Sequence, residues 1–206
     1  MKKEWLGNTT SSFVTIGASR QREHERAMGD FYATNPRAVD ALEYAGKLPQ
    51  SKKIWECAAG QGDLSEALIK RGYEVISTDL YDRGYCESGT DFLLTKELLA
   101  PCIFTNPPYA LVTEFCSHAI NLGADEIYMF LKLQFLEGKR RYNEIYCKNP
   151  PAEVLQFIER MSVALNGSRD GFKNSSAIAF CWMIWRKGHH GSPQVSWISA
   201  DRRYAS

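Results

Sequence analysis

The sequence predicts an α/β protein built on a mainly parallel sheet of about seven strands, with helices on both faces and an antiparallel hairpin late in the chain. Three observations carry this prediction. Apolar strand-like runs alternate with helix-like segments from Arg37 to about Leu133. A glycine-rich turn stands between the first such strand and the helix after it. Two further apolar runs, 152–161 and 176–187, have no helix between them, which favours antiparallel pairing.

Length and composition indicate one globular domain. The chain has 206 residues, of which 44% are hydrophobic and 24% are charged, as in proteins with one full core. We expect a single domain at 31–206 and a polar N-terminal extension at 1–30. The sequence lacks both a secretory signal and the run of about 18 apolar residues that spans a membrane. We therefore expect a cytoplasmic protein without a membrane partner; composition does not specify its oligomeric state.

The elements follow from local patterns in chain order. Pro36 opens and Gly46 closes a helix-like segment with apolar residues at helical spacing. A β-α-β unit comes next, with strands at 54–57 and 75–78 around a helix at about 64–70. Beyond it we expect helix, strand, helix and strand at 90–99, 102–105, 111–123 and 126–133. The hairpin is expected at the edge of the sheet.

The glycine-rich turn in "ECAAGQGD" is a predicted ligand site. Gly60 and Gly62 permit a tight turn and let a ligand approach backbone N–H groups. Asp79 ends the next strand, where an acid can accept both hydroxyls of a ribose. Glu56 precedes the turn and would repel a diphosphate, whereas it suits a ligand with positive charge. S-adenosylmethionine carries an ammonium, a sulfonium and a ribose, and is the expected cofactor.

Two residues between the strands expected at 75–78 and 102–105, where a further short strand is presumed to precede them, are candidates for the adenine end of that cofactor. Asp91 can hydrogen-bond an adenine amino group, and Phe92 can pack on the ring. The alternative for Phe92 is a place in the hydrophobic core.

A rigid corner follows the strand at 102–105. In "FTNPPY", Pro107 and Pro108 fix their own φ, lack backbone donors and hold the preceding residues extended. The corner presents the amide of Asn106 and the ring of Tyr109 at the end of a buried strand. Rigidity at such a place indicates a binding or catalytic role.

Four motifs, "ECAAGQG", "STDLYDRG", "GTDFL" and "FTNPPY", occur in the order found in class I S-adenosylmethionine-dependent amino-methyltransferases. The last resembles the [DNS]-P-P-[YFW] motif that these enzymes carry after the fourth strand. The segment "GDFYATNPRAVDAL" resembles their additional cofactor-binding motif. Two later stretches, "LKLQFLEGKRRY" and "WMIWRKGHHG", are similar to small DNA adenine methyltransferases of phages and prophages. The resemblance covers about residues 19–197 and implies a Rossmann-like fold in the cytoplasm of a bacterial host.

The resemblance implies methyl transfer to an exocyclic amino group of a nucleobase, most of all adenine N6 in DNA. The implied catalytic residues are Asn106, Pro107, Pro108 and Tyr109. The implied cofactor-binding residues are Tyr32, Thr34, Glu56, Ala58, Gly60, Gly62, Asp79, Leu80, Asp91, Phe92 and Asn106. The lone pair of such an amine is delocalised into the ring, so oxygens of Asn106 and Pro107 that accept its two N–H bonds would localise it. Tyr109 would stack on the base.

A DNA substrate requires base flipping and cations that hold the phosphate backbone. The candidates for these contacts are Lys139, Arg140, Arg141, Arg186, Lys187, His189 and His190. Larger relatives carry a separate target-recognition domain. None is expected here, so we predict a modest or absent sequence preference.

Several alternatives stay open. The same corner could bind the amino group of cytosine N4, of an RNA base or of a glutamine side chain in a protein. A noncatalytic binding module could also retain the fold and the cofactor pocket. Methylation at carbon 5 of cytosine would need a thiolate, for which Cys102 after Pro101 is a candidate; because it enters the strand, we expect it in the core. The cysteines stand singly, without C-x-x-C pairs, so no metal site is expected.

Overall fold

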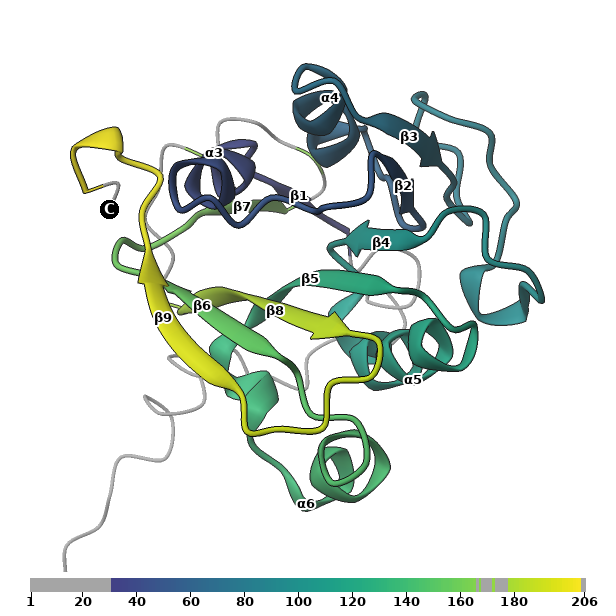
Figure 1. Cartoon of the computed structure of the whole chain (residues 1–206). Coiled ribbons are helices and arrows are strands. Elements are labelled where there is room, and N and C mark those ends of the chain that lie inside the picture. Colours follow the sequence, from purple (N-terminus) through teal and green to yellow (C-terminus); the bar gives the residue numbers. More distant parts are fainter. Residues whose placement is uncertain (1–30, 166, 168–171, 173–177, 205–206) are drawn as a thin grey trace, which may run out of the picture. The chain divides into compact units, whose positions relative to one another are not determined.

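The computed structural model describes residues 31–165, 167, 172 and 178–204; the predicted extension at 1–30 lies outside these residues. Seven strands form one sheet in the order β3-β2-β4-β5-β8-β6-β9 (Figure 1). The first four in this order run parallel, β8 is antiparallel to β5 and β6, and β9 is parallel to β6. The strand bounds are β2 Lys53–Glu56, β3 Glu74–Ser77, β4 Cys102–Thr105, β5 Glu126–Lys132, β6 Glu153–Phe157, β8 Phe180–Arg186 and β9 Gln194–Ile198. The predicted α/β fold with a mainly parallel, Rossmann-like sheet is confirmed.

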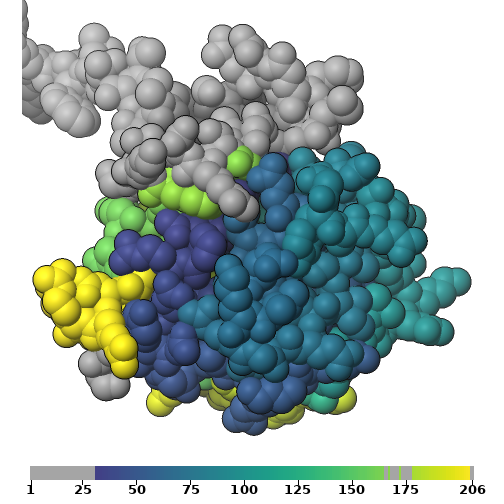
Figure 2. Space-filling view, turned by 90° about the horizontal axis from the view of Figure 1, so that it is seen from above, coloured from purple at the N-terminus to yellow at the C-terminus, as the bar shows by residue number. Residues whose placement is uncertain are grey.

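Helices cover both faces of this sheet (Figure 1). On one face lie α3 (Arg37–Tyr44) and α4 (Asp63–Ile69), and the purple and blue chain of this region makes up much of the surface in Figure 2. The other face is covered by α5 (Val112–Asn121) and by a π-helical turn at Tyr142–Tyr146 that follows α6 (Lys139–Arg141). The three helices expected near these positions are confirmed. Within the described residues, no helix is both long and apolar enough to cross a bilayer.

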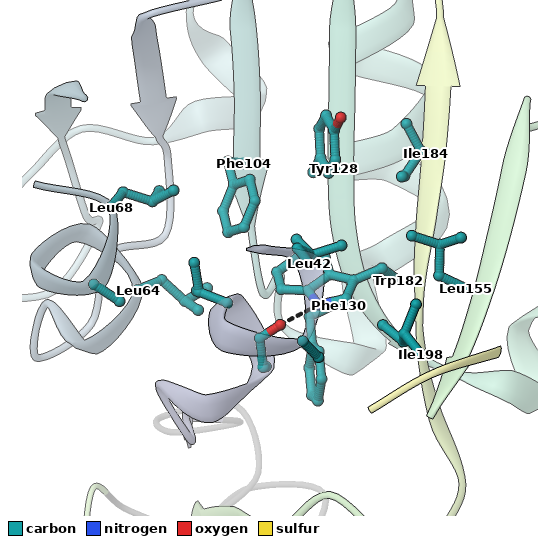
Figure 3. Packing of buried hydrophobic residues seen from close by; sticks show 14 of the residues in the cluster. Leu42, Leu64, Leu68, Phe104, Tyr128, Phe130, Leu155, Trp182, Ile184 and Ile198 are labelled. Atoms are coloured by element: carbon teal, nitrogen blue, oxygen red, sulfur yellow. Dashed lines mark hydrogen bonds between the residues drawn. The ribbon is translucent and has the colours of Figure 1, made fainter. Parts of the chain in front are cut away.

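Large aromatic side chains fill the core beneath α3 and α4 (Figure 3). They come from the three central strands and are Phe104, Tyr128, Phe130, Phe180 and Trp182. The indole Nε1–H of Trp182 donates to the carbonyl of Ala38 at 2.9 Å. This bond satisfies a buried donor and ties α3 to the sheet.

The helix predicted at 90–99 is wrong. The segment contains only a 3₁₀ turn at Phe92–Leu94, started by the Asp91 carboxylate, which accepts from the Leu93 N–H. The apolar residues of 90–99 point to all sides of a helical projection, so a helix here has no single face to bury. Leu94 is accordingly 76% exposed.

The predicted hairpin is confirmed as a pair but not as the sheet edge. β6 and β8 pair antiparallel, yet β8 lies between β5 and β6, and β9 forms the edge. β9 was not expected, because its five residues are too few for a clear periodic pattern. In the structure Val195 and Trp197 on this edge strand are exposed.

A separate two-stranded sheet was also not expected from the sequence. β1 (Tyr32–Thr34) pairs antiparallel with β7 (Val163–Leu165). Each strand has three residues, too few for a periodic pattern, and the pairing joins parts of the chain about 130 residues apart. β1 becomes important below because it contacts the proline corner.

A charged network lies at the edge of the sheet where β5 and β6 begin. The Arg186 guanidinium, at the end of β8, pairs with the carboxylates of Glu126 and Glu153. The Lys47 ammonium pairs with Glu153 at 2.5 Å. Burial alone would raise the pKa of Glu153, but the hydrogen bonds from Lys47 and Arg186 outweigh it, so the pKa is lowered.

This lowered pKa predicts a loss of stability in acid. The folded state holds Glu153 ionised at a pH where the unfolded chain takes up a proton. The network therefore stabilises the fold at neutral pH, and this stabilisation is lost as the pH falls from the ordinary pKa of a glutamate to the lowered one. We expect Glu153→Gln to lower the free energy of unfolding by about 1 to 3 kcal/mol at pH 7 and to flatten its decline in acid. Urea unfolding at several pH values measures both.

Glu74→Gln is the matched control, because Glu74 forms an exposed pair with Lys53 at 3.3 Å. Exposed pairs contribute about 0 to 1 kcal/mol. Equal effects of the two substitutions would contradict a stabilising role of the network.

Candidate active site

The carboxyl ends of β2, β3 and β4 bring the glycine turn, Asp79 and Asn106 to one edge of the sheet. β2 pairs in parallel with β3 and β4, so the segments that follow them leave at the same edge. Two backbone bonds of 3.0 Å join the first two segments: Thr78 N–H donates to the Glu56 carbonyl, and Ala59 N–H donates to the Thr78 carbonyl.

The turn after β2 requires its two glycines. Gly60 and Gly62 have φ of 58° and 83°, a left-handed conformation that side chains disfavour. A Cβ at Gly60 would lie 2.4 Å from the Phe31 ring, and one at Gly62 would lie 2.3 Å from the Tyr85 ring. Only glycine at these two positions leaves room for the two aromatic rings to approach the turn so closely.

Asp79 braces this turn. One carboxylate oxygen accepts from the Gly60 N–H at 2.8 Å and the other from the Tyr81 N–H at 2.9 Å, with the Arg83 guanidinium 3.9 Å away. A carboxylate accepts about four hydrogen bonds, so Asp79 keeps acceptor capacity beside the glycine turn. Its position is compatible with the expected contact to a ribose.

Glu56 is a buried carboxylate that a bound cation would stabilise. It is 1% exposed, and its pKa is raised well above the ordinary value, chiefly by burial and further by the negative charge of Asp79, while Thr105 and the Ala58 N–H partly offset this. Among the described residues, neither carboxylate oxygen has a hydrogen-bond partner of normal geometry. A cation bound here would satisfy the acid. The site thus fits the ammonium of the expected cofactor.

The amide of Asn106 is fixed in one orientation. Its Nδ2 donates to the Tyr32 carbonyl in β1 at 2.8 Å. Its Oδ1 is buried and accepts from no group in the described part of the chain. Since a buried acceptor without a donor is costly, the oxygen is ready for an N–H group of a bound molecule. Pro107, which follows, is buried, and Pro108 leads into a short 3₁₀ turn at Tyr109–Leu111.

The Tyr109 ring is surrounded by protein groups. Its centre lies 5.1 Å from that of Tyr32 and 6.2 Å from that of Phe180, and the Lys132 ammonium lies 4.1 Å over the ring. A base that stacks on Tyr109, as the sequence predicts, has to compete with these neighbours for the ring.

Phe92 belongs to the core, which corrects its predicted role as a platform for adenine. It is 2% exposed, and its ring lies 5.2 Å from Trp55 and 4.8 Å from Phe115, centre to centre. Its apolar surface is already used by these contacts. Asp91 lies nearer the surface, where its side chain caps the 3₁₀ turn through Leu93.

The remaining predicted cofactor residues differ in their burial and contacts. Tyr32 contributes its carbonyl to Asn106, and Thr34 is buried at the end of β1. Ala58 is half-buried in the glycine turn, and Leu80 is 45% exposed next to Asp79. Of these four residues, Leu80 is the most exposed.

Four of the predicted nucleic-acid contacts lie at the wrong edge of the sheet. The register places Arg186 opposite Glu126, the first residue of β5, so β8 carries Arg186, Lys187, His189 and His190 away from Asn106. Arg186 is also neutralised by its two glutamates, and Lys187 pairs with Asp125 at 3.1 Å. The antiparallel direction of β8 is the reason for this correction.

The other three predicted contacts follow the carboxyl end of β5, at the edge that carries Asn106. Arg140 is exposed and pairs with Glu114 and Glu144. The Arg141 guanidinium donates to backbone carbonyls, including that of Phe135 at 2.9 Å. Lys139 is exposed. Most of the charge of this group is therefore engaged within the protein.

Cys102 is placed in the core, as expected. It is fully buried at the start of β4, and burial raises the pKa of its thiol well above the ordinary value. Asn106 follows the other end of the same strand. A thiolate nucleophile is thus excluded from Cys102 at this corner.

Sequence reasoning missed four side chains around the site. Lys132 lies over Tyr109, the Phe31 and Tyr85 rings approach the glycine turn, and the Arg83 guanidinium lies 4.1 Å over Phe31. The one available signal was Lys132 itself, a charge that ends the apolar run of β5. The other three contacts depend on the tertiary structure.

No protein-family model matches the sequence, and comparison with curated proteins gives no significant match. Solved structures with a similar fold include a Pyrococcus horikoshii protein assigned as an RNA methyltransferase, with 17% identity over 87% of this chain and 98% of that one (TM-score 0.57). A predicted O-methyltransferase from Agrobacterium tumefaciens has 12% identity over 78% and 85% (TM-score 0.51). A dimethyladenosine transferase from Plasmodium falciparum has 16% identity over 76% and 63% (TM-score 0.50). The chain therefore has the fold of these methyltransferases.

Proposed function

We propose that the protein transfers a methyl group from S-adenosylmethionine to an exocyclic amino group of a nucleobase, with adenine N6 in DNA as the favoured target. The observation that carries this proposal is the pair of unmet polar groups at one edge of the sheet. Among the described residues, neither the Glu56 carboxylate nor Asn106 Oδ1 has a hydrogen-bond donor. A cationic methyl donor and an amine would supply these donors.

Glu56, the glycine turn and Asp79 would hold the cofactor. Glu56 would take the ammonium, the backbone at Gly60 and Gly62 would contact the methionine end, and Asp79 would accept from the ribose. When bound, S-adenosylmethionine supplies a methyl group on a positively charged sulfur. The similar solved structures are described as methyltransferases, which supports a methyl donor as the ligand.

The corner would act on the amine. Asn106 Oδ1 and the Pro107 carbonyl would each accept a hydrogen bond from one N–H of the amine. These two bonds fix the orientation of the amine and localise the lone pair on its nitrogen. The Tyr32 carbonyl prevents the amide from rotating, because a flipped Asn106 would present its NH₂ group to the amine. Rigid acceptors need no reorganisation during the reaction. After transfer the amine releases one proton to solvent, and no side chain is required as a covalent nucleophile.

Cytosine N4, an RNA base and a protein glutamine amide present the same two N–H groups and would meet the same acceptors. A noncatalytic module would retain Glu56 but have no need of an oriented Asn106. The DNA substrate, the modest sequence preference and the cytoplasm of a bacterial host are parts of the proposal that follow from the motif resemblance.

Incubation with tritium-labelled cofactor tests the proposal. Purified protein is supplied with DNA, RNA and a protein extract, and the labelled fraction is digested and analysed by mass spectrometry. We expect label in DNA and recovery of N6-methyldeoxyadenosine. Label in the protein fraction alone, or no label in any nucleic acid, would rule out the proposed substrate class.

A further inference from the structure

The dipeptide Phe31–Tyr32 contacts both halves of the candidate site. On the cofactor side, the Phe31 ring fills the space into which a side chain at Gly60 would project, since a Cβ there would lie 2.4 Å from Phe31 Cε2. On the other side, the Tyr32 carbonyl accepts from Asn106 Nδ2 at 2.8 Å, and the Tyr32 ring lies 5.1 Å from that of Tyr109, centre to centre. Two adjacent residues thus join the turn proposed for the cofactor to the corner proposed for the amine.

Groups on the cofactor side hold the Phe31 ring. The Arg83 guanidinium lies 4.1 Å over the ring, a cation–π distance, and 3.9 Å from the Asp79 carboxylate. Asp79 in turn accepts from the N–H of Gly60 at 2.8 Å. The position of the Phe31 ring therefore depends on Gly60 and Asp79, two groups to which the proposed function assigns the cofactor.

The strand that begins at Tyr32 needs support from its surroundings. β1 has three residues and pairs with three residues of β7 in a sheet of two strands, and a pair of strands this small is only marginally stable by itself. Movement of β1 displaces the Tyr32 carbonyl, and an Asn106 amide released from it can turn its NH₂ group toward the amine. The packing of Phe31 on Gly60 limits this movement at the start of the strand.

We propose that Phe31 is a positioning residue, whose ring transmits the state of the glycine turn to the Asn106 amide through the Tyr32 carbonyl. A bound cofactor fixes Gly60 and Asp79, these fix the Phe31 ring, and the next residue then holds Asn106 in its accepting orientation. This rests on the proposed function and refines it: the acceptor for the amine is most rigid when the methyl donor is present. Because such a link is reciprocal, the bound amine strengthens cofactor binding by the same factor.

Two variants of Phe31 and one control separate this role from a merely structural one. Phe31→Ala removes the ring, and Phe31→Leu retains an apolar group that still packs on Gly60. Tyr204→Ala is the matched control, because the Tyr204 ring also lies beneath an arginine, with Arg203 6.0 Å from its centre, but follows the outermost strand β9.

The first measurement uses the cofactor product alone. S-adenosylhomocysteine at saturation should slow hydrogen exchange of the backbone amides of β1 and β7 in the wild type by about fivefold or more. In Phe31→Ala the same ligand should slow them by less than about twofold, while the amides of the glycine turn at 58–62 are protected in both proteins. Phe31→Leu should lie between the two, and Tyr204→Ala should match the wild type.

The second measurement adds an adenine-containing DNA oligonucleotide. S-adenosylhomocysteine should strengthen DNA binding by about tenfold in the wild type and by less than about twofold in Phe31→Ala. Single-turnover transfer at saturating S-adenosylmethionine and DNA should be slower in Phe31→Ala by about tenfold, because Asn106 is held less firmly. A merely structural role of Phe31 lowers the temperature of unfolding and leaves the coupling between the two ligands unchanged.

Equal protection of β1 by S-adenosylhomocysteine in the wild type and Phe31→Ala, or equal coupling of the two ligands in both, would overturn this inference while the proposed function stands. If the wild type gains protection in β1 through Phe31 but methylates no nucleic acid, the proposed substrate class fails and the link from Gly60 to Tyr32 is retained. A wild type that does not bind S-adenosylhomocysteine would contradict both.

Discussion

Replacing Asn106 with Ala is expected to reduce methyl transfer severely and to leave the affinity for S-adenosylmethionine largely intact. The substitution removes Oδ1, one of the two oxygens that would localise the lone pair of the amine. Losing one oriented hydrogen-bonding group of this kind typically lowers kcat by about 10² to 10³. Because Asn106 is also the group that anchors the Tyr32 carbonyl, we expect a further loss of about 1 kcal/mol in stability.

Single-turnover assays with labelled cofactor measure the rate of transfer, and calorimetry measures cofactor binding. Asn121→Ala serves as the control, because Asn121 is exposed at the end of α5. A noncatalytic module predicts that Asn106→Ala and Asn121→Ala are equally without effect. Wild-type activity in Asn106→Ala would contradict the mechanism, and lost cofactor affinity would show that Asn106 acts through the cofactor.

Glu56→Gln is expected to weaken cofactor binding and to stabilise the protein without cofactor. A buried carboxylate that lacks a cation destabilises the fold, while the same carboxylate paired with an ammonium contributes a charge-assisted hydrogen bond of about 1.5 to 3 kcal/mol. The neutral amide removes both effects, so affinity should fall by about 10- to 100-fold. Opposite changes in stability and binding are typical of a residue kept for function.

The stability gain should depend on pH with a definite sign. Because the pKa of Glu56 is raised in the folded state, the unfolded chain loses this proton first, and folding becomes less favourable as the pH rises from the ordinary pKa of a glutamate to the raised one. Glu56→Gln lacks this group, so its advantage over the wild type should increase across that interval and then level off.

Urea unfolding at several pH values, together with calorimetry, measures the two effects of Glu56→Gln. Glu97→Gln is the control, as Glu97 is exposed in the segment before β4. A variant that is less stable than the wild type at neutral pH, or one that binds the cofactor equally well, would contradict the assigned role of Glu56.

Local patterns in the sequence were sufficient for the β-α-β unit, the glycine turn and the proline corner. Strand periodicity, the conformational needs of Gly60 and Gly62 and the fixed φ of Pro107 act within a few residues, so they are visible without knowledge of the fold. The parallel direction of β2, β3 and β4 then brings their carboxyl ends together. For this reason the sequence alone was sufficient to bring the glycine turn, Asp79 and Asn106 to one edge of the sheet.

Only the tertiary structure decided what surrounds these residues. The antiparallel direction of β8 carries Arg186 and the residues after it to the far edge, and burial between Trp55 and Phe115 removes Phe92 from the cofactor site. The Tyr32 carbonyl reaches Asn106, and Lys132 reaches Tyr109, across 74 and 23 positions of the chain. Strand direction and long-range side-chain contacts depend on the packing of the whole domain, and no local pattern encodes them.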